Sequence, residues 1–159
     1  MWIVAWGCAL LLLYLFFADR LEQQFNPNQK PESLVESGYV EVVLKRNRGG
    51  QYVTSGKIND RDVIFLVDTG ASGISIPEQV AKPIGLRKGQ AFQTLTANGI
   101  GTSYMTEVDK ITIGSLEVGP LKAGINPNMP DNLVLLGMSV LKDLEFTQRG
   151  DTLILRQLK

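Results

Sequence analysis

The chain has 159 residues, 44% of them hydrophobic, which is enough for one modest domain with its own core and a short accessory segment. Its 16 basic and 16 acidic residues give a formal net charge of zero and form no basic block, so we expect no nucleic-acid partner. The chain has no histidine and one cysteine, Cys8, which excludes histidine-dependent hydrolysis, intrachain disulfides and thiolate metal sites. We expect neither a metal nor a cofactor, and carboxylate chemistry remains open for catalysis.

The chain begins with an uninterrupted apolar stretch from Trp2 to Ala18. As a helix rising ~1.5 Å per residue it would extend ~26 Å, close to the ~30 Å hydrocarbon core of a bilayer. A cleaved signal peptide is the competing interpretation, but no Lys or Arg precedes the stretch and its end lacks the small-residue pattern of a cleavage site. We therefore predict a transmembrane anchor over residues 1–18, which contacts the membrane through residues 2–18.

Residues 19–37 are polar and contain several Gln, Asn and Pro residues. Such a segment buries too little apolar surface to fold alone, so we predict a flexible polar tether that leads to a domain over residues 38–159. The few charges near the apolar stretch give almost no positive-inside bias and lean slightly towards a cytoplasmic domain.

The domain region contains short apolar runs separated by turn signals at close spacing. The expected strands are 39–45, 51–58, 63–67, 108–113, 116–125, 144–147 and 152–155, with a short helix at 77–82 that Pro83 ends and a loop at 126–132. This many short strands favours an all-β fold, a closed or partly closed β-barrel with one or two short helices.

The strand at 63–67 delivers Asp68 into a turn rich in hydroxyls and glycine. The turn residues are Thr69, Gly70, Ala71 and Ser72. A carboxylate at the end of such an apolar strand is retained only where a turn aims hydrogen-bond donors at it. From this turn alone two interpretations are open, half of a catalytic acid pair or a residue that caps the next segment.

Two later signals accompany this turn. Residues 93–107 are typical of two extended arms around Ala97, Asn98 and Gly99, because an Asn-Gly step is a strong hairpin signal. Further along, an apolar strand beginning at Leu133 ends in Leu135, Leu136 and Gly137 and is followed by a short helical pattern.

The Asp-Thr-Gly turn and the later apolar strand ending in Gly occur together in retroviral-type aspartic proteases. From about Gly50 to Arg156 the chain resembles the retropepsin-like family of clan AA, in particular its bacterial members tethered by one N-terminal segment. The resemblance implies a single-lobe acid-protease β-barrel, with Asp68 catalytic and the 97–99 hairpin as a flap over a peptide substrate. It also implies a periplasmic or extracytoplasmic domain, which we adopt over the weak charge signal.

The chain carries one Asp-Thr-Gly, whereas an aspartic protease needs two carboxylates, one as base and one as acid. We therefore expect a symmetric homodimer in which two Asp68 side chains meet at the twofold axis and activate a water. Two unit charges ~4 Å apart repel by ~4 kcal/mol at an effective dielectric near 20, so the pair should share one proton. The family implies that Thr69 reaches across the axis. Gly70 would permit close approach, and Ser72 would donate a hydrogen bond to Asp68.

The sequence thus predicts a membrane-anchored aspartic endopeptidase that acts on peptides or proteins. Two alternatives from other classes remain open. One is a non-catalytic module of the same fold that binds extended peptides by strand addition, and the other is an unrelated structural β-barrel whose Asp68 turn only caps a strand. The pattern does not identify the residues of a substrate pocket.

Overall fold

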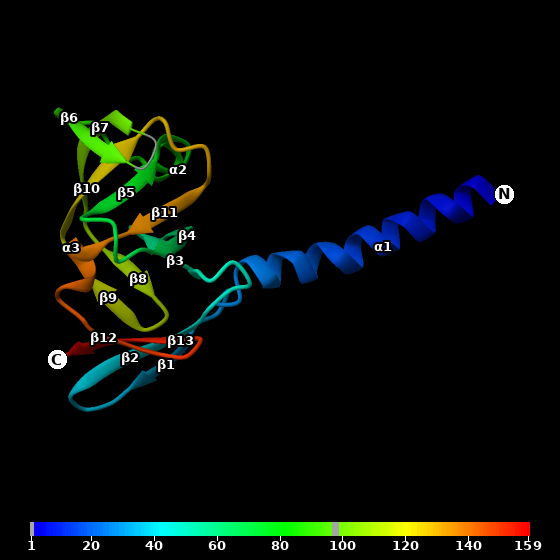
Figure 1. Ribbon diagram of the computed structural model, residues 1–159, viewed down its shortest axis with the longest axis horizontal. Coiled ribbons are helices and arrows are strands. Elements are labelled where there is room, and N and C mark those ends of the chain that lie inside the picture. Colours follow the sequence, from blue (N-terminus) through cyan, green and yellow to red (C-terminus); the bar gives the residue numbers. More distant parts are fainter. Residues whose placement is uncertain (1, 97–98) are drawn as a thin grey trace.

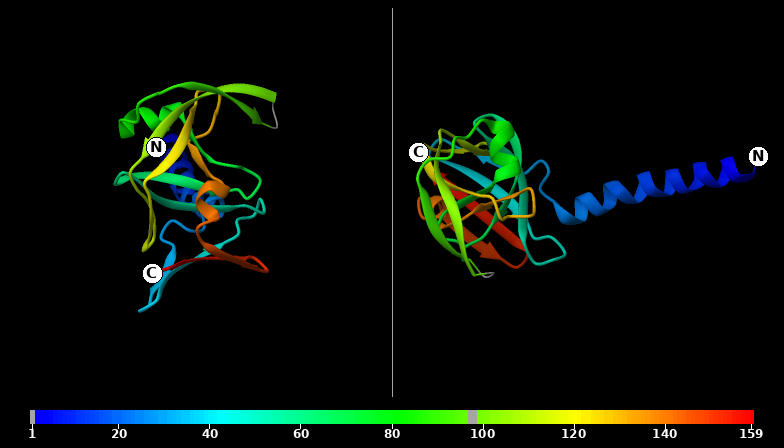
Figure 2. Two further views of the ribbon diagram at one scale, coloured as in Figure 1. Left: turned by 90° about the vertical axis from the view of Figure 1, so that its left-hand side faces the viewer. Right: turned by 90° about the horizontal axis from the view of Figure 1, so that it is seen from above.

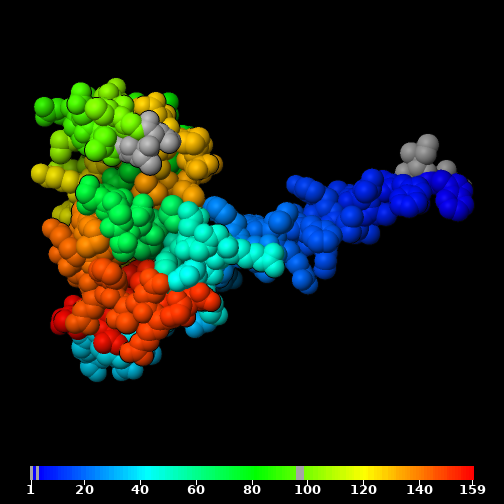
Figure 3. All heavy atoms as spheres, in the orientation of Figure 1, coloured from blue at the N-terminus to red at the C-terminus, as the bar shows by residue number. Residues whose placement is uncertain are grey.

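The computed structural model describes residues 2–96 and 99–159. One long helix, α1 (Trp2–Phe25), projects away from a domain made almost entirely of strands (Figures 1 and 3). The strands are β1 (Glu32–Val35), β2 (Tyr39–Lys45), β3 (Tyr52–Ile58), β4 (Arg61–Val67), β5 (Ile74–Pro77), β6 (Ala91–Thr96), β7 (Gly99–Val108), β8 (Ile111–Ile113), β9 (Leu116–Val118), β10 (Leu121–Asn126), β11 (Leu133–Leu136), β12 (Glu145–Arg149) and β13 (Thr152–Leu158). Two short helices, α2 (Glu78–Ile84) and α3 (Met138–Leu141), complete the domain.

The strands form two sheets. The smaller is antiparallel, with the order β1-β2-β13-β12, and it closes the lower end of the domain, in cyan and red in the left-hand view of Figure 2. The larger has the order β6-β7-β10-β5-β11-β4-β3-β8-β9, and within it β4 pairs with β11, and β5 with β10, in parallel. The expected mostly-β fold with short helices is confirmed, and β4, which leads into Asp68, lies inside the larger sheet between β3 and β11.

The core forms because alternate side chains of the strands face inward. In β4, Val63, Phe65 and Val67 are buried while the residues between them are partly exposed. The same alternation occurs in β2 and in β13. Full burial of an aliphatic or aromatic side chain contributes about 1.5–3 kcal/mol, so these inward faces hold the two sheets together.

Most expected strands appear close to their predicted positions, and the differences have local causes. The strands expected at 108–113 and 116–125 are each divided, because the chain turns at Asp109–Lys110 and at Gly119–Pro120. Strand β5 was not expected, since a run of four residues gives too short a pattern. Helix α2 continues through Pro83 for one residue and ends where Gly85 adopts φ 83°, a left-handed conformation that suits glycine.

Residues 19–37 differ from the flexible tether expected from their composition. Helix α1 continues to Phe25, and β1 pairs with β2 in the register Glu32↔Val43. Between these elements Asn26 and Asn28 are buried, at 2% and 3% exposure. The prediction failed because side-chain hydrogen bonds, rather than apolar burial, fix this segment to the domain.

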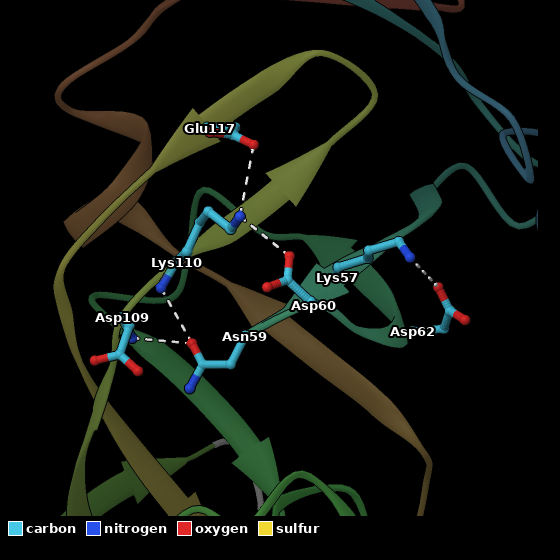
Figure 4. Close-up of polar contacts among 7 residues, drawn as sticks. All are labelled: Lys57, Asn59, Asp60, Asp62, Asp109, Lys110 and Glu117. Atoms are coloured by element: carbon cyan, nitrogen blue, oxygen red, sulfur yellow. Dashed lines mark hydrogen bonds and ion pairs between the residues drawn. The ribbon is translucent and has the colours of Figure 1, made fainter.

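A polar cluster fixes the β3–β4 hairpin to the β8–β9 hairpin (Figure 4). Asn59 and Asp60 have φ values of 47° and 64°, as a two-residue hairpin turn requires. Asn59 Oδ1 accepts hydrogen bonds from the backbone N–H groups of Asp109 at 3.0 Å and Lys110 at 3.1 Å. The Lys110 ammonium lies 3.1 Å from Asp60 and 3.8 Å from Glu117, and the hydrogen bond with Asp60 is the main reason its pKa is raised. The cluster holds the end of β4 opposite to Asp68.

Within the described residues, one helix is long and apolar enough to cross a membrane. It covers Val4–Phe25, has a mean hydropathy of 1.7 and is not buried against the domain. Figure 3 shows it as an isolated rod.

Candidate active site

Asp68 lies at the carboxyl end of β4, in the middle of the larger sheet. Its backbone N–H donates to Leu136 O at 3.1 Å, which continues the parallel pairing of β4 with β11. The residue before it, Val67, is buried, whereas Asp68 is half-buried. The carboxylate therefore lies where a core strand reaches the surface, supported by backbone and partly exposed to solvent.

The turn after Asp68 folds back onto its carboxylate. The backbone N–H of Gly70 donates to Asp68 Oδ1 at 2.9 Å, and the N–H of Ala71 donates to Asp68 O at 3.2 Å. A Cβ atom on Gly70 would lie 3.2 Å from Asp68 Oδ1, which is closer than most such contacts. Glycine thus lets the backbone approach the carboxylate.

The second apolar-Gly motif packs directly on this turn. Leu135 and Leu136 pair in parallel with Leu66 and Val67, so β11 ends beside Asp68. A Cβ atom on Gly137 would collide with the backbone carbonyl oxygens of Ala71 and Gly73. Only a glycine fits between these two segments.

Two backbone hydrogen bonds join the motifs. Met138 N–H donates to Ala71 O at 2.8 Å, and Ser139 N–H donates to Ser72 O at 3.0 Å. The first residues of α3 thus hold the turn that carries Asp68. Two segments about seventy residues apart in the sequence form one rigid unit.

The side chains of Thr69 and Ser72 are exposed. In the part of the chain that the structure describes, the Asp68 carboxylate accepts one hydrogen bond, from the Gly70 N–H. The hydrogen bond expected from the Ser72 hydroxyl to Asp68 is not present. Ser72 instead supports the turn through its backbone carbonyl, which accepts from Ser139.

The predicted central hairpin is formed by β6 and β7 with the register Thr96↔Gly99. Ala97 and Asn98, at its expected tip, lie outside the described residues, and Gly99 has φ 108°. Leu95 and Ile100, paired across the hairpin, are 82% and 73% exposed. An exposed apolar pair on a projecting hairpin is a surface that a ligand can cover.

Two buried hydroxyls lie near the turn, and from the sequence Ser139 was interpreted as an ordinary turn hydroxyl. Ser139 Oγ and Tyr52 OH have no hydrogen-bond partner among the described residues. Tyr52 pairs with Val67, next to Asp68, and Ser139 bonds through its backbone to Ser72. A strand tyrosine and a serine after glycine carry no distinctive pattern, so only the fold shows that both hydroxyls are buried beside the turn. The described residues also contain no group of three potential metal-ligating side chains.

Comparisons with known proteins agree with this geometry. Residues 54–143, more than half of the chain, match the family model described as gag-polyprotein putative aspartyl protease. An uncharacterized protein in the cobV 5' region of a Sinorhizobium species is 32% identical over 144 residues, which cover 88% of this chain and 62% of the relative's length. The chain thus spans less than two thirds of that relative. An uncharacterized protein of Rickettsia prowazekii is 28% identical over 159 residues, covering 94% of this chain and 68% of the relative.

A solved structure is also similar. The crystal structure of a retropepsin-like aspartic protease from Rickettsia conorii has a TM-score of 0.63 and 28% identity, and the match covers 81% of this chain and 96% of that chain.

Proposed function

We propose, from the premise that this chain belongs to the retropepsin-like, gag-polyprotein aspartyl protease family, that it is a membrane-anchored aspartic endopeptidase. The observation that carries the proposal is the packing of Gly137 against the backbone of Ala71 and Gly73. This contact, with the hydrogen bonds from Met138 and Ser139, fixes the Asp68 turn in one position. A turn that only capped a strand would not need a second segment locked onto it.

The chemistry requires a second carboxylate, and we propose that a second copy of the chain supplies it. Each chain contributes one Asp68, and the two meet at a twofold axis. One carboxylate takes a proton from water while the other, protonated, polarises the scissile carbonyl, so hydrolysis needs neither a metal nor a covalent intermediate. The Gly70 N–H, 2.9 Å from Asp68 Oδ1, holds the carboxylate in place for this pairing.

We further propose that α1 anchors the enzyme in the cell membrane as a single span. Its apolar residues form a helix long enough to cross a bilayer, and the apolar window found among the described residues is not buried against the domain. The proposed position of the domain is periplasmic or extracytoplasmic, as the family resemblance implies. The substrate class is peptides or proteins presented in an extended form.

The proposal is tested with the full-length chain in detergent or in vesicles. A library of peptides from a digested proteome is incubated with the wild type, with Asp68→Asn, and with Asp131→Asn as a matched exposed control. We expect new peptide termini with the wild type and the control but none with Asp68→Asn. Cleavage by Asp68→Asn at the wild-type rate would overturn the protease proposal, and binding without cleavage by the wild type would identify a peptide-binding module.

A further inference from the structure

Hydrogen bonds join helix α1 to the domain, and no flexible linker lies between the helix and the domain. Asn28 is the central residue, and its side chain lies between β2 of the smaller sheet and β3 of the larger one. Asn28 Nδ2 donates to Lys45 O at 2.8 Å and to Val53 O at 2.7 Å, and Asn28 Oδ1 accepts from Lys45 N–H at 2.7 Å. All the polar atoms of one buried amide are thus used to join the two sheets.

The backbone around Asn28 is fixed as well. Its carbonyl accepts from Ser55 N–H at 3.0 Å, and its N–H donates to Asn26 Oδ1 at 3.1 Å. Asn26 Nδ2 in turn donates to Ser55 Oγ at 2.9 Å. The three residues after the helix are therefore part of the folded domain.

The last turn of α1 has its own contacts with the domain. Asn26 N–H donates to Glu22 O at 2.8 Å, and Asn47 Nδ2, from the loop between β2 and β3, donates to Phe25 O at 3.0 Å. Arg48 of the same loop reaches Gln24 Oε1 at 3.3 Å. Figure 1 shows this loop alongside the end of the helix. The helix and the domain are consequently joined as one body.

The same loop links the helix end to Asp68. Asn47 exchanges two hydrogen bonds with Gln51, at 2.8 Å and 2.9 Å, and the next residue, Tyr52, pairs with Val67. Adjacent strands lie ~5 Å apart and consecutive Cα atoms ~3.8 Å apart, so these three crossings and two steps along the chain place Asp68 within about 25 Å of Phe25. The Asp68 turn is thus at the end of the β3–β4 hairpin that faces the helix.

From these contacts we infer that the enzyme acts on the membrane-proximal segments of other membrane-bound polypeptides. The inference rests on the proposed function. Beyond Ala18, the seven helical residues 19–25 rise ~10 Å, so Asp68 is held within about 35 Å of the edge of the hydrocarbon core. A chain leaving the membrane in an extended form covers ~3.3 Å per residue and passes this height within its first ten or so residues. A rigid connection selects peptide bonds at that height, whereas a flexible tether would sample many heights.

The experiment compares two anchored substrates in vesicles containing the full-length enzyme. Both carry the best-cleaved peptide from the library on a single transmembrane helix. In one, about five residues separate the peptide from the membrane; in the other, a rigid helical spacer of about 30 residues raises it by about 45 Å. We expect the wild type to cleave the short form at least about tenfold faster, because only there is the effective concentration of substrate high.

The matched variant has about 30 Gly and Ser residues inserted between Phe25 and Asn26, which separates the helix from the domain while keeping both. It should cleave the two anchored substrates within about twofold of each other. Equal cleavage of both by the wild type, or a tenfold preference retained by the insertion variant, would overturn the inference. Both enzymes should hydrolyse the free peptide at the same rate. A failure of the wild type on the free peptide rejects the proposed function instead.

A second readout does not depend on catalysis. In a Cys8→Ala background, Thr147→Cys on exposed β12 carries a fluorescent donor, and labelled lipid is the acceptor. We expect a narrow distribution of energy transfer for the otherwise wild-type chain and a broad, weaker one for the insertion variant. Identical distributions would show that the junction is not rigid and would overturn the inference.

Discussion

The backbone N–H of Met138 donates a 2.8 Å hydrogen bond to the carbonyl oxygen of Ala71, and Gly137, one residue earlier, lies against that same carbonyl. One end of α3 is thereby fixed to the turn that begins at Asp68. The position of the carboxylate depends on a residue about seventy positions away, whose essential property is that it has no side chain.

Gly137→Ala should destabilise the domain by about 3 kcal/mol or more and abolish hydrolysis, because the added methyl group meets backbone oxygens that cannot move independently. Gly73→Ala is the matched control, since a Cβ atom there meets nothing within 4 Å. Chemical denaturation measures the free energy of unfolding of both variants. Equal stability of the two variants would contradict the role assigned to Gly137.

Mixing wild type with Asp68→Asn tests the two-chain site. If chains pair at random in equal amounts, only about one quarter of the dimers keep both carboxylates, so activity should fall to about a quarter of that of the same total amount of wild type. If each chain contained a complete site, the mixture would retain about half of that activity. Mixing with Asp131→Asn, an exposed residue, controls for the effect of substitution and should leave the activity unchanged.

The parts of the fold that the sequence predicted are those encoded in continuous stretches. Alternation of apolar residues predicted a strand at 39–45, which is where β2 forms. It also predicted that the strand before Asp68 ends at Val67, as β4 does. The sequence identified the Asp68 turn and the run ending in Gly137 as two motifs of one family, because each is a contiguous run and their order resembles that family. Their packing against each other was not part of that prediction. Its physical reason, the absence of room for a Cβ atom, needed the structure.

The parts that failed depend on contacts between residues distant in the sequence. Asn28 was assigned to a flexible tether because polar composition predicts little burial, yet its partners are Lys45 and Val53, 17 and 25 residues later. The Ser72 hydroxyl is a separate, local case: it was expected to donate to Asp68, but within the same turn the Gly70 N–H donates to that carboxylate instead. The partners of Asn28, by contrast, leave no pattern in the local sequence.

Asn28→Ala should lower the free energy of unfolding by about 2–4 kcal/mol, because it removes three side-chain hydrogen bonds and leaves the buried carbonyl of Val53 and the partly buried backbone groups of Lys45 without these partners. Asn132→Ala, in an exposed loop, is the control and should change stability by less than about 0.5 kcal/mol. Denaturant titration followed by circular dichroism compares them. If Asn28→Ala lowers the free energy of unfolding no more than Asn132→Ala does, Asn28 does not hold the two sheets together.

Ser72→Ala should leave the pH dependence of hydrolysis unchanged. If the Ser72 hydroxyl stabilised the ionised Asp68 pair, its removal would move the upper limb of a bell-shaped profile to higher pH. Among the described residues the hydroxyl makes no hydrogen bond with the carboxylate, so we expect no such movement. Profiles of wild type and variant with the same peptide provide the measurement, and a clear upward shift would restore the hydrogen bond predicted from the sequence.

Glu78 should make the domain sensitive to acid. Its carboxylate lies 2.9 Å from the ammonium of Lys88 and 2.9 Å from that of Lys82, and the hydrogen bond with Lys88 is the main reason its pKa is lowered from the usual 4.5. Because the folded pKa lies below the unfolded one, the ionised pairs contribute fully above about pH 4.5 and their contribution is lost as pH falls through the lowered value.

The same Lys88 ammonium lies 4.6 Å from the centre of the Tyr104 ring in β7, so Glu78 holds a contact with the hairpin proposed as the flap. Glu78→Gln should therefore reduce the melting temperature at pH 6. It should also make the drop in melting temperature between pH 6 and pH 3 smaller than in the wild type. Glu36→Gln, at an exposed residue with no ion pair among the described residues, should keep the wild-type difference. Thermal unfolding at the two pH values decides the matter: if Glu78→Gln loses as many degrees between pH 6 and pH 3 as the wild type, another carboxylate is responsible for the sensitivity to acid.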